Sequence, residues 1–337
     1  MIKLSENICG RFKGRRVAVI GDLVADQFLY GTISRVSREA PVFILKHAET
    51  ETRPGAAANA AANVASLGGI PLLVGVVGGD QQGKELLAAL DLNGVDTKRV
   101  VTLPERSTTT KVRVLAGQPY AARQQVIRID YEDGSVDAGA SGIKVLANAL
   151  EAVAEADAVV ISDYNYGLAT RELIDAVQQL ASERSIPVIA DSRFGLREFA
   201  RFTSATPNQE EAEALLGREF RPEDAESLRS DLDLTSLVVT LGGNGMVLAE
   251  KGKPTISVPA VGSEQPVDVT GAGDTVIAAY SLGLASGMTA FEAASLANHA
   301  GGIVVMKRGT AVATADEVVR SLASKPPNST SAAANEA

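Results

Sequence analysis

The sequence of 337 residues is 45% hydrophobic and carries a formal net charge of −9 at pH 7. A chain of this length and composition can bury one large core. Its acidic balance leaves no general basic surface for a phosphate backbone, so nucleic acid is not expected as a partner. With one cysteine, Cys9, and two histidines, the sequence supports neither a His/Cys metal cluster nor a histidine-based triad.

The N-terminal residues MIKLSENICGRFKGRR lack the apolar core of a signal peptide. The longest apolar runs, such as GGIVVM, are far too short to span a bilayer. We therefore expect a soluble, cytoplasmic protein without a membrane partner.

Short β-branched runs alternate with longer alanine- and leucine-rich segments along most of the chain. VAVIGD is followed by AANAAANVASLG, and LLVGVVG by KELLAALDLNG, and further β-branched runs are DAVVISD, IPVIADS and LTSLVVTLGG. This alternation predicts an α/β fold with a central, mostly parallel sheet flanked by helices. Because the runs end in small or acidic residues, ligand sites are expected at the carboxyl ends of these strands.

Two stretches, residues 27–48 and 108–130, contain β-type residues without intervening helices. They predict a small antiparallel sheet beside the core, either as an ordinary edge extension or as a lid over a substrate. We expect residues 1–323 to form one domain that includes this sheet. Residues 324–337 are small, polar and proline-containing, which predicts disorder.

Two familiar nucleotide-binding patterns are not supported. GGDQQGKE has the glycine and lysine spacing of a Walker A loop, but Glu85 stands where a magnesium-binding Ser or Thr belongs. VAVIGDL has one glycine where a dinucleotide fingerprint needs three.

The stretch VDVTGAGDTVIAAY, residues 267–280, carries two aspartates around a glycine-rich turn. Small residues from Gly271 through Ala272 to Gly273 allow backbone N–H groups to approach an anion at the start of a helix. Asp274 follows immediately and either accepts a proton from an attacking hydroxyl or caps the helix. Asp268, on the other side of the turn, could hold a cation or orient the loop.

Two weaker patterns precede this stretch. TPNQEEAEALLG places Asn208 and Glu211 three residues apart, which fits a capping box or a polar pair that organises magnesium through water. TLGGNG puts Thr240, Gly242 and Gly245 after a strand, which suits a backbone approach to nucleotide phosphates.

In this order, N-x-x-E, T-x-G-x-x-G and D-x-T-G-A-G-D resemble the motifs of the ribokinase-type (PfkB) carbohydrate kinases. GDLVAD, PGAAANAAAN and GGDQQG resemble the sugar-binding segments of that family, so the likeness runs from about residue 16 to 323. The resemblance implies a ribokinase-like fold and an ATP- and Mg²⁺-dependent transfer of phosphate to a sugar hydroxyl. It also implies a possible K⁺ site near Asp268.

The resemblance also implies roles for individual residues. Asp274 would be the catalytic base, and Gly271, Ala272 and Gly273 would form the anion hole. The residues implied in nucleotide binding are Asn208, Glu211 (with magnesium through water), Thr240, Gly242, Gly245 and Asn298. Those implied in substrate binding are Asp22, Asp26, Gly55, Asn59 and Asp163, with candidate phosphate partners Arg53, Lys111, Arg113, Arg123, Arg128 and Arg193.

Within the family, RPGAAANAAANVASLGG, RQQVIRID and VDVTGAGDTVI resemble kinases of D-glycero-D-manno-heptose 7-phosphate, which act on the anomeric hydroxyl in ADP-heptose biosynthesis. Tyr166 in SDYNYG departs from them, because a lysine is usual there, and AGQPYAAR resembles an insertion in the lid. Bifunctional relatives carry an H-x-G-H nucleotidyl-transfer site, which this sequence lacks. We therefore expect that step to belong to another protein.

Two alternatives remain open at the level of sequence. The first is a PfkB kinase for another sugar or sugar phosphate, such as a ketose or a pentose, and Tyr166 favours it. The second is a sensor that binds a nucleotide or sugar without chemistry, against which the intact GAGD weighs. Exposed edges of the lid strands predict a homodimer.

Overall fold

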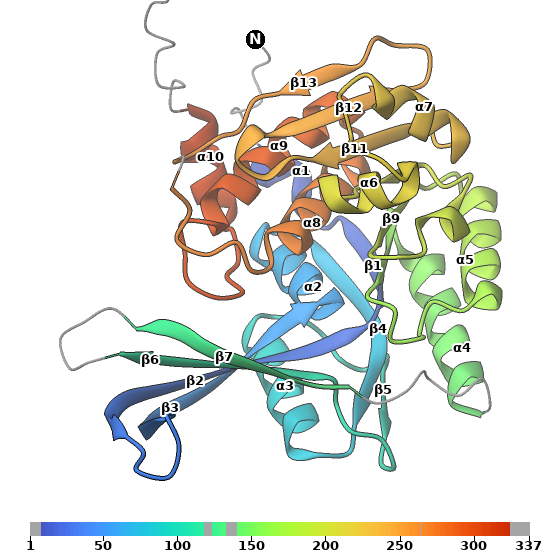
Figure 1. The fold of residues 1–337 in the computed structure, drawn as a ribbon. Coiled ribbons are helices and arrows are strands. Elements are labelled where there is room, and N and C mark those ends of the chain that lie inside the picture. Colours follow the sequence, from blue (N-terminus) through green and yellow to red (C-terminus); the bar gives the residue numbers. More distant parts are fainter. Residues whose placement is uncertain (1–7, 118–122, 133–139, 264, 324–337) are drawn as a thin grey trace, which may run out of the picture.

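The computed structural model describes residues 8–117, 123–132, 140–263 and 265–323 (Figure 1). A nine-stranded sheet has the order β13-β12-β11-β10-β9-β8-β1-β4-β5. Neighbours from β11 to β5 are parallel, and β12 and β13 are added antiparallel. The strands are β1 (Arg16–Gly21), β4 (Ile70–Gly78), β5 (Val100–Leu103), β8 (Ala158–Asp163), β9 (Val188–Ser192), β10 (Ser204–Ala205), β11 (Ser236–Thr240), β12 (Met246–Glu250) and β13 (Ile256–Val258).

Helices cover both faces of this sheet and bury two separate apolar clusters against it. One face carries α1 (Ile8–Phe12), α2 (Ala57–Ser66), α3 (Gln81–Leu92), α8 (Ala272–Ala285), α9 (Ala290–Val304) and α10 (Ala315–Ala323). The other carries α4 (Ala140–Glu155), α5 (Arg171–Glu183), α6 (Gln209–Leu216) and α7 (Asp224–Asp231). Short 3-10 turns lie at η1 (Leu196–Phe199) and η2 (Gly242–Asn244).

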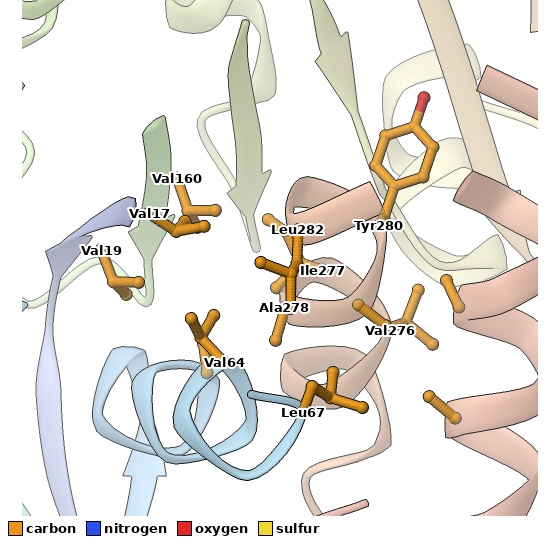
Figure 2. Close-up of a cluster of buried hydrophobic side chains, with 14 of the residues drawn as sticks. Val17, Val19, Val64, Leu67, Val160, Val276, Ile277, Ala278, Tyr280 and Leu282 are labelled. Atoms are coloured by element: carbon orange, nitrogen blue, oxygen red, sulfur yellow. The ribbon is translucent and has the colours of Figure 1, made fainter. Parts of the chain in front are cut away.

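Burial on both faces explains why the strands read as continuous apolar runs. Along β1, Val17 and Val19 point into the first cluster, whereas Ala18 and Ile20 point into the second. Figure 2 shows part of the first cluster, where β-strand valines face the helices α2 and α8 across from Ile277. The predicted mostly parallel sheet between helices is therefore confirmed.

The small sheet stands off the central body at one end (Figure 1). Its order is β3-β2-β6-β7, with β2 (Leu23–Val36), β3 (Phe43–Ala56), β6 (Thr110–Gly117) and β7 (Gln124–Tyr131). β2, β3 and β7 extend beyond the predicted limits at 27–48 and 108–130, whereas β6 lies within them.

The small sheet is antiparallel except for one pairing. β2 with β3 and β6 with β7 are antiparallel as predicted, whereas β2 and β6 run parallel. The parallel pair arises because β2 follows β1 and β6 follows β5, and β1 and β5 point in the same direction in the central sheet. Both segments, β2 and β6, therefore leave the central sheet at the same edge, where the parallel strands end.

Some expectations concern residues outside the described part of the chain. The predicted disorder of residues 324–337 is one, and most of the predicted insertion AGQPYAAR is another. Among the described residues, none of the helices combines the length and apolarity required to cross a membrane.

Candidate active site

A cavity of about 340 Å³ opens between the small sheet and the carboxyl ends of the central strands. Its walls come from segments far apart in the sequence, which meet because parallel strands end at one edge. The lining side chains include Asp26, Lys111, Arg113, Arg128, Asp163, Tyr164, Asp191, Arg193, Thr206, Asn208, Glu211, Thr240 and residues 269–274.

The glycine-rich turn forms one wall of this cavity at the start of α8. Gly271 is the N-cap residue and has a φ of 77°, and a Cβ there would lie 2.5 Å from Nδ2 of Asn59. A Cβ on Gly273 would meet no protein atom within 4 Å, so its missing side chain leaves room for a ligand. The amide of Ala272 donates to the Val269 carbonyl at 3.2 Å. The amides of Gly271 and Gly273 are thus better candidates for anion contacts than that of Ala272.

Asp274 is buried in the first turn of α8 and caps nothing, which removes the capping interpretation. Its Oδ2 accepts a hydrogen bond from Asn59 Nδ2 at 2.9 Å, and its Oδ1 accepts one from the Tyr164 hydroxyl at 2.7 Å. Burial raises the pKa of Asp274 to about 6, although these two hydrogen bonds oppose the rise. The carboxyl is therefore largely ionised at pH 7 yet basic enough to accept a proton.

Asp268 orients the turn that leads to this wall. Its Oδ1 accepts from the amide of Thr270 at 3.0 Å and its Oδ2 from the amide of Gly309 at 2.8 Å. Burial opposes ionisation, but these hydrogen bonds outweigh it and lower the pKa of Asp268. In the described part of the chain, no group of three or more His, Cys, Asp or Glu side chains is arranged to hold a metal ion.

The basic side chains of the cavity come mainly from the small sheet. Arg113 forms a buried ion pair with Asp26, and Arg128 Nε lies 2.9 Å from Asp130 Oδ1. Among the described residues, neither Lys111 nor Arg193 forms a salt bridge, and both lie over aromatic rings instead.

Lys111 and Arg193 share one ring. The Lys111 Nζ lies 5.6 Å and the Arg193 Cζ 4.9 Å from the ring centre of Tyr164. Burial, and then the charge of Arg193, lower the pKa of Lys111. Two like charges that share a partly buried ring, without a salt bridge to any described carboxylate, favour an anionic ligand.

Carboxylates on the central body line the opposite side. Burial, followed by the charges of Glu211 and Asp274, raises the pKa of Asp191 well above its usual range. Burial likewise raises the pKa of Glu211. A cation beside Asp191 and Glu211 would offset both effects, so these residues fit a bound Mg²⁺.

Asn208 and Glu211 form the predicted capping box and also face the cavity. They form a capping box at α6, with Asn208 Oδ1 accepting from the Glu211 amide and Glu211 Oε2 from the Asn208 amide, both at 2.9 Å. Both also line the cavity beside Thr240. The cap fixes the position of the carboxylate that faces the site.

Two residues assigned to substrate binding support the site from behind. Gly55 leaves space for Asp26, because a Cβ on Gly55 would lie 2.5 Å from Asp26 Oδ2. Asp22 does not line the main cavity; its Oδ2 accepts from the amides of Tyr164 and Tyr166 at 2.8 and 3.1 Å. Burial raises the pKa of Asp22 to about 6.

Other predicted residues lie away from the lining. Arg53 pairs with Glu51 at 2.7 Å and donates to the Arg308 carbonyl at 2.7 Å. Asn298 donates to the Pro259 carbonyl at 2.7 Å. Gly245 has a φ of 88°, and a Cβ there would lie 2.1 Å from the Val258 carbonyl oxygen. The polar atoms or backbones of these residues thus make contacts within the protein outside the cavity lining.

Two further assignments also fall outside the lining. Gly242 has a φ of 55° with open space around it. Arg123 stacks over the ring of Tyr30, with its Cζ 5.3 Å from the ring centre.

Tyr164 and Asp191 line the cavity but were not among the predicted site residues. Both sit at the carboxyl end of a parallel strand, Tyr164 just after β8 and Asp191 within β9. Asp163 and Arg193 were assigned from the family resemblance. The expectation that ligand sites gather at strand ends covers Tyr164 and Asp191 as well, so its application to each strand would have found both.

Comparison with known proteins identifies the family. The pattern of the pfkB family carbohydrate kinases matches residues 15–317. The chain belongs to this family. It is a carbohydrate kinase, a phosphotransferase with an alcohol group as acceptor, as the sequence motifs implied.

Curated relatives of this PfkB chain include two named bifunctional protein HldE. The one from Caulobacter vibrioides is 39% identical over 316 residues, and the one from Geobacter metallireducens is 38% identical over 323 residues. The alignments cover 91% and 94% of this chain but 63% and 65% of those proteins. The chain thus spans less than two thirds of the length of these relatives.

Solved structures confirm the ribokinase-like fold. Ribokinase from Arabidopsis thaliana, complexed with ribose and ATP, superposes with a TM-score of 0.71 at 21% identity and covers 93% of this chain and 100% of that one. Phosphofructokinase-2 from Escherichia coli, in complex with potassium, gives 0.71 at 20% identity and covers 92% and 98%. At these identities the likeness concerns the fold alone.

Proposed function

We propose that this PfkB kinase transfers the γ-phosphoryl group of ATP to the anomeric hydroxyl of D-glycero-D-manno-heptose 7-phosphate, in ADP-heptose biosynthesis. Its similarity to the HldE proteins and its sequence likeness to heptose 7-phosphate kinases support this substrate. The observation that carries the proposal is the separation of charge across the cavity. On the small sheet Lys111, Arg113 and Arg128 outnumber Asp26, whereas on the central body Asp163, Asp191, Glu211 and Asp274 outnumber Arg193.

This separation suits two anionic substrates bound on opposite sides. A phosphorylated sugar on the side of the small sheet would supply the negative charge that Lys111 and Arg193 lack. Magnesium bound to ATP would neutralise charge beside Asp191 and Glu211 and at the transferred group. The sugar hydroxyl would then lie between the two, next to Asp274.

In this mechanism Asp274 accepts the proton of the attacking hydroxyl. Its carboxylate is held by Asn59 and Tyr164, so it needs no reorganisation during the reaction. The amides of Gly271 and Gly273, at the positive end of the α8 dipole, stabilise the charge that develops on the transferred group. The small sheet, acting as a lid, excludes water that would otherwise receive the phosphate.

A kinase for another sugar remains the second candidate, and Tyr166 is the observation that favours it. The Tyr166 hydroxyl donates to Glu132 Oε1 at 2.7 Å, and its ring lies 5.6 Å from Lys111 Nζ. An aromatic ring thus occupies the position where the heptose kinases usually carry a lysine. A changed acceptor pocket would leave the role of Asp274 intact.

The first prediction concerns the base. Asp274→Asn is expected to lower turnover by about 10²- to 10⁴-fold, because an amide cannot accept the hydroxyl proton. In the unaltered protein, kcat/KM should fall below about pH 6, where Asp274 becomes protonated. ADP release measured from pH 5 to 8 checks both, and calorimetry with ATP tests whether binding is retained. Turnover near the original level would remove Asp274 from the mechanism.

The second prediction concerns the acceptor. ADP release should be greater with heptose 7-phosphate than with unphosphorylated heptose, fructose, ribose or fructose 6-phosphate. Lys111→Met should raise the KM for heptose 7-phosphate about ten- to a hundredfold, because one charged hydrogen bond is lost, and should leave the KM for ATP unchanged. Lys98→Met, at an exposed lysine, is the control. A preference for an unphosphorylated sugar would favour the second candidate.

A third proposal places K⁺ near Asp268, whose carboxylate stays ionised between the Thr270 and Gly309 amides. The rate should fall when potassium is replaced by tetramethylammonium at constant ionic strength, because that cation is too large for the same position. An unchanged rate would contradict the potassium site.

We also propose a homodimer formed through the small sheet. β3 and β7 are its edge strands, and large apolar side chains on them are exposed, including Phe43 at 54% and Ile127 at 53%. Light scattering at micromolar concentration should give twice the chain mass, and Ile127→Asp should halve it. Ile143→Asp, at a site 69% exposed on α4, should have no effect. A monomeric mass for the unaltered protein would refute the dimer.

A further inference from the structure

Tyr164 connects three parts of the candidate site. Its amide donates to Asp22 at 2.8 Å, which fixes the backbone just after β8. Its ring lies beneath Lys111 and Arg193, and its hydroxyl donates to Asp274. The mechanism proposed above uses this hydroxyl only as one of two donors that hold the Asp274 carboxylate.

The carboxylate of Asp274 is held from two directions. Asn59, on α2, donates to one oxygen and is itself held by Asn63, whose Nδ2 donates to Asn59 Oδ1 at 3.2 Å. Tyr164, after β8, donates to the other oxygen. The two donors therefore fix the plane of the carboxylate between a helix and the end of a strand.

We infer that Tyr164 is a positioning residue for the catalytic base: its hydroxyl keeps the Asp274 carboxylate ionised and aimed into the cavity. The inference rests on the proposed role of Asp274. Asp26 and Asp191 face the same carboxylate and disfavour its charge, whereas Arg193 and Asn59 favour it. Tyr164 is the second donor to this carboxylate, after Asn59. The ionised carboxylate accepts a hydrogen bond freely on each oxygen, whereas in the neutral form one oxygen carries the proton, so the second donor favours the ionised form of Asp274.

The Tyr164 hydroxyl is suited to this role because it remains a donor. Burial, and then the charge of Asp274, raise the pKa of Tyr164 well above its usual value. The hydroxyl therefore stays protonated whenever Asp274 is charged. It cannot itself serve as the base near neutral pH.

Tyr164→Phe removes the hydroxyl and keeps the ring beneath Lys111 and Arg193. We expect the acid limb of kcat/KM, measured with the best acceptor of the sugar panel, to move up by about one pH unit, since a hydrogen bond to the ionised carboxylate is lost. Tyr280→Phe is the matched control, because the Tyr280 hydroxyl is also buried but contacts Ser204 and Ser236 instead. It should leave the acid limb in place.

A second measurement needs no substrate. The pKa of Asp274 in the folded protein is raised from 3.8 to about 6, so ionising it costs stability as pH rises through this range. Without the Tyr164 hydroxyl this cost is larger, so Tyr164→Phe should lower Tm more at pH 7.5 than at pH 5. In the Asp274→Asn background the effect of Tyr164→Phe should be the same at both pH values.

The outcomes separate this inference from the proposed function. The role of Tyr164 is overturned if the acid limb depends on Asp274 but does not move in Tyr164→Phe. It is also overturned if the effect of Tyr164→Phe on Tm is independent of pH while Asp274 is present. If Asp274→Asn retains turnover, the proposed role of Asp274 as the base is overturned instead. The Tm comparison then still decides whether Tyr164 supports the charge of Asp274.

Discussion

The arrangement of the site depends on one buried carboxylate, Asp274, held between Asn59 and Tyr164. A buried carboxylate is costly unless donors compensate for lost water, and here the donors come from α2 and from the end of β8. The hydrogen bonds therefore join two helices and the central sheet around the start of α8. Each element can hold its place only if the others do, which explains why Gly271 must lack a side chain where Asn59 passes.

Close approach also joins the small sheet to the body. The Arg53 side chain and the ring of Phe28 pack against Gly309, where a Cβ would lie 2.8 Å from each. The Gly309 amide in turn donates to Asp268, which orients the turn before Gly271. The small sheet and the glycine-rich wall thus share one continuous set of contacts, which fixes their positions relative to each other.

Sequence patterns located most of the site because chemistry and backbone geometry coincide in them. GAGD could be placed at a helix start from local physics, whereas the choice of base over cap for its aspartate came from the neighbouring motifs and the family resemblance. Arg53, Asn298 and Gly245 were predicted from the same patterns but lie outside the cavity lining, because a residue type shows which contacts are possible and not which partner is nearer. Tyr164 follows the end of β8 but was missed, because individual site residues were assigned from family motifs and not from strand ends.

The sequence by itself determined the alternation of strands and helices, the two-sided burial of the parallel sheet and the family, since each rests on local periodicity or on short motifs. The tertiary structure alone decided which charges meet. It set the parallel pairing of β2 with β6, the pairing of Arg113 with Asp26, and the two donors on Asp274. These contacts join residues up to 215 positions apart in the sequence. The direction of two strands and the burial of a charge depend on the whole fold.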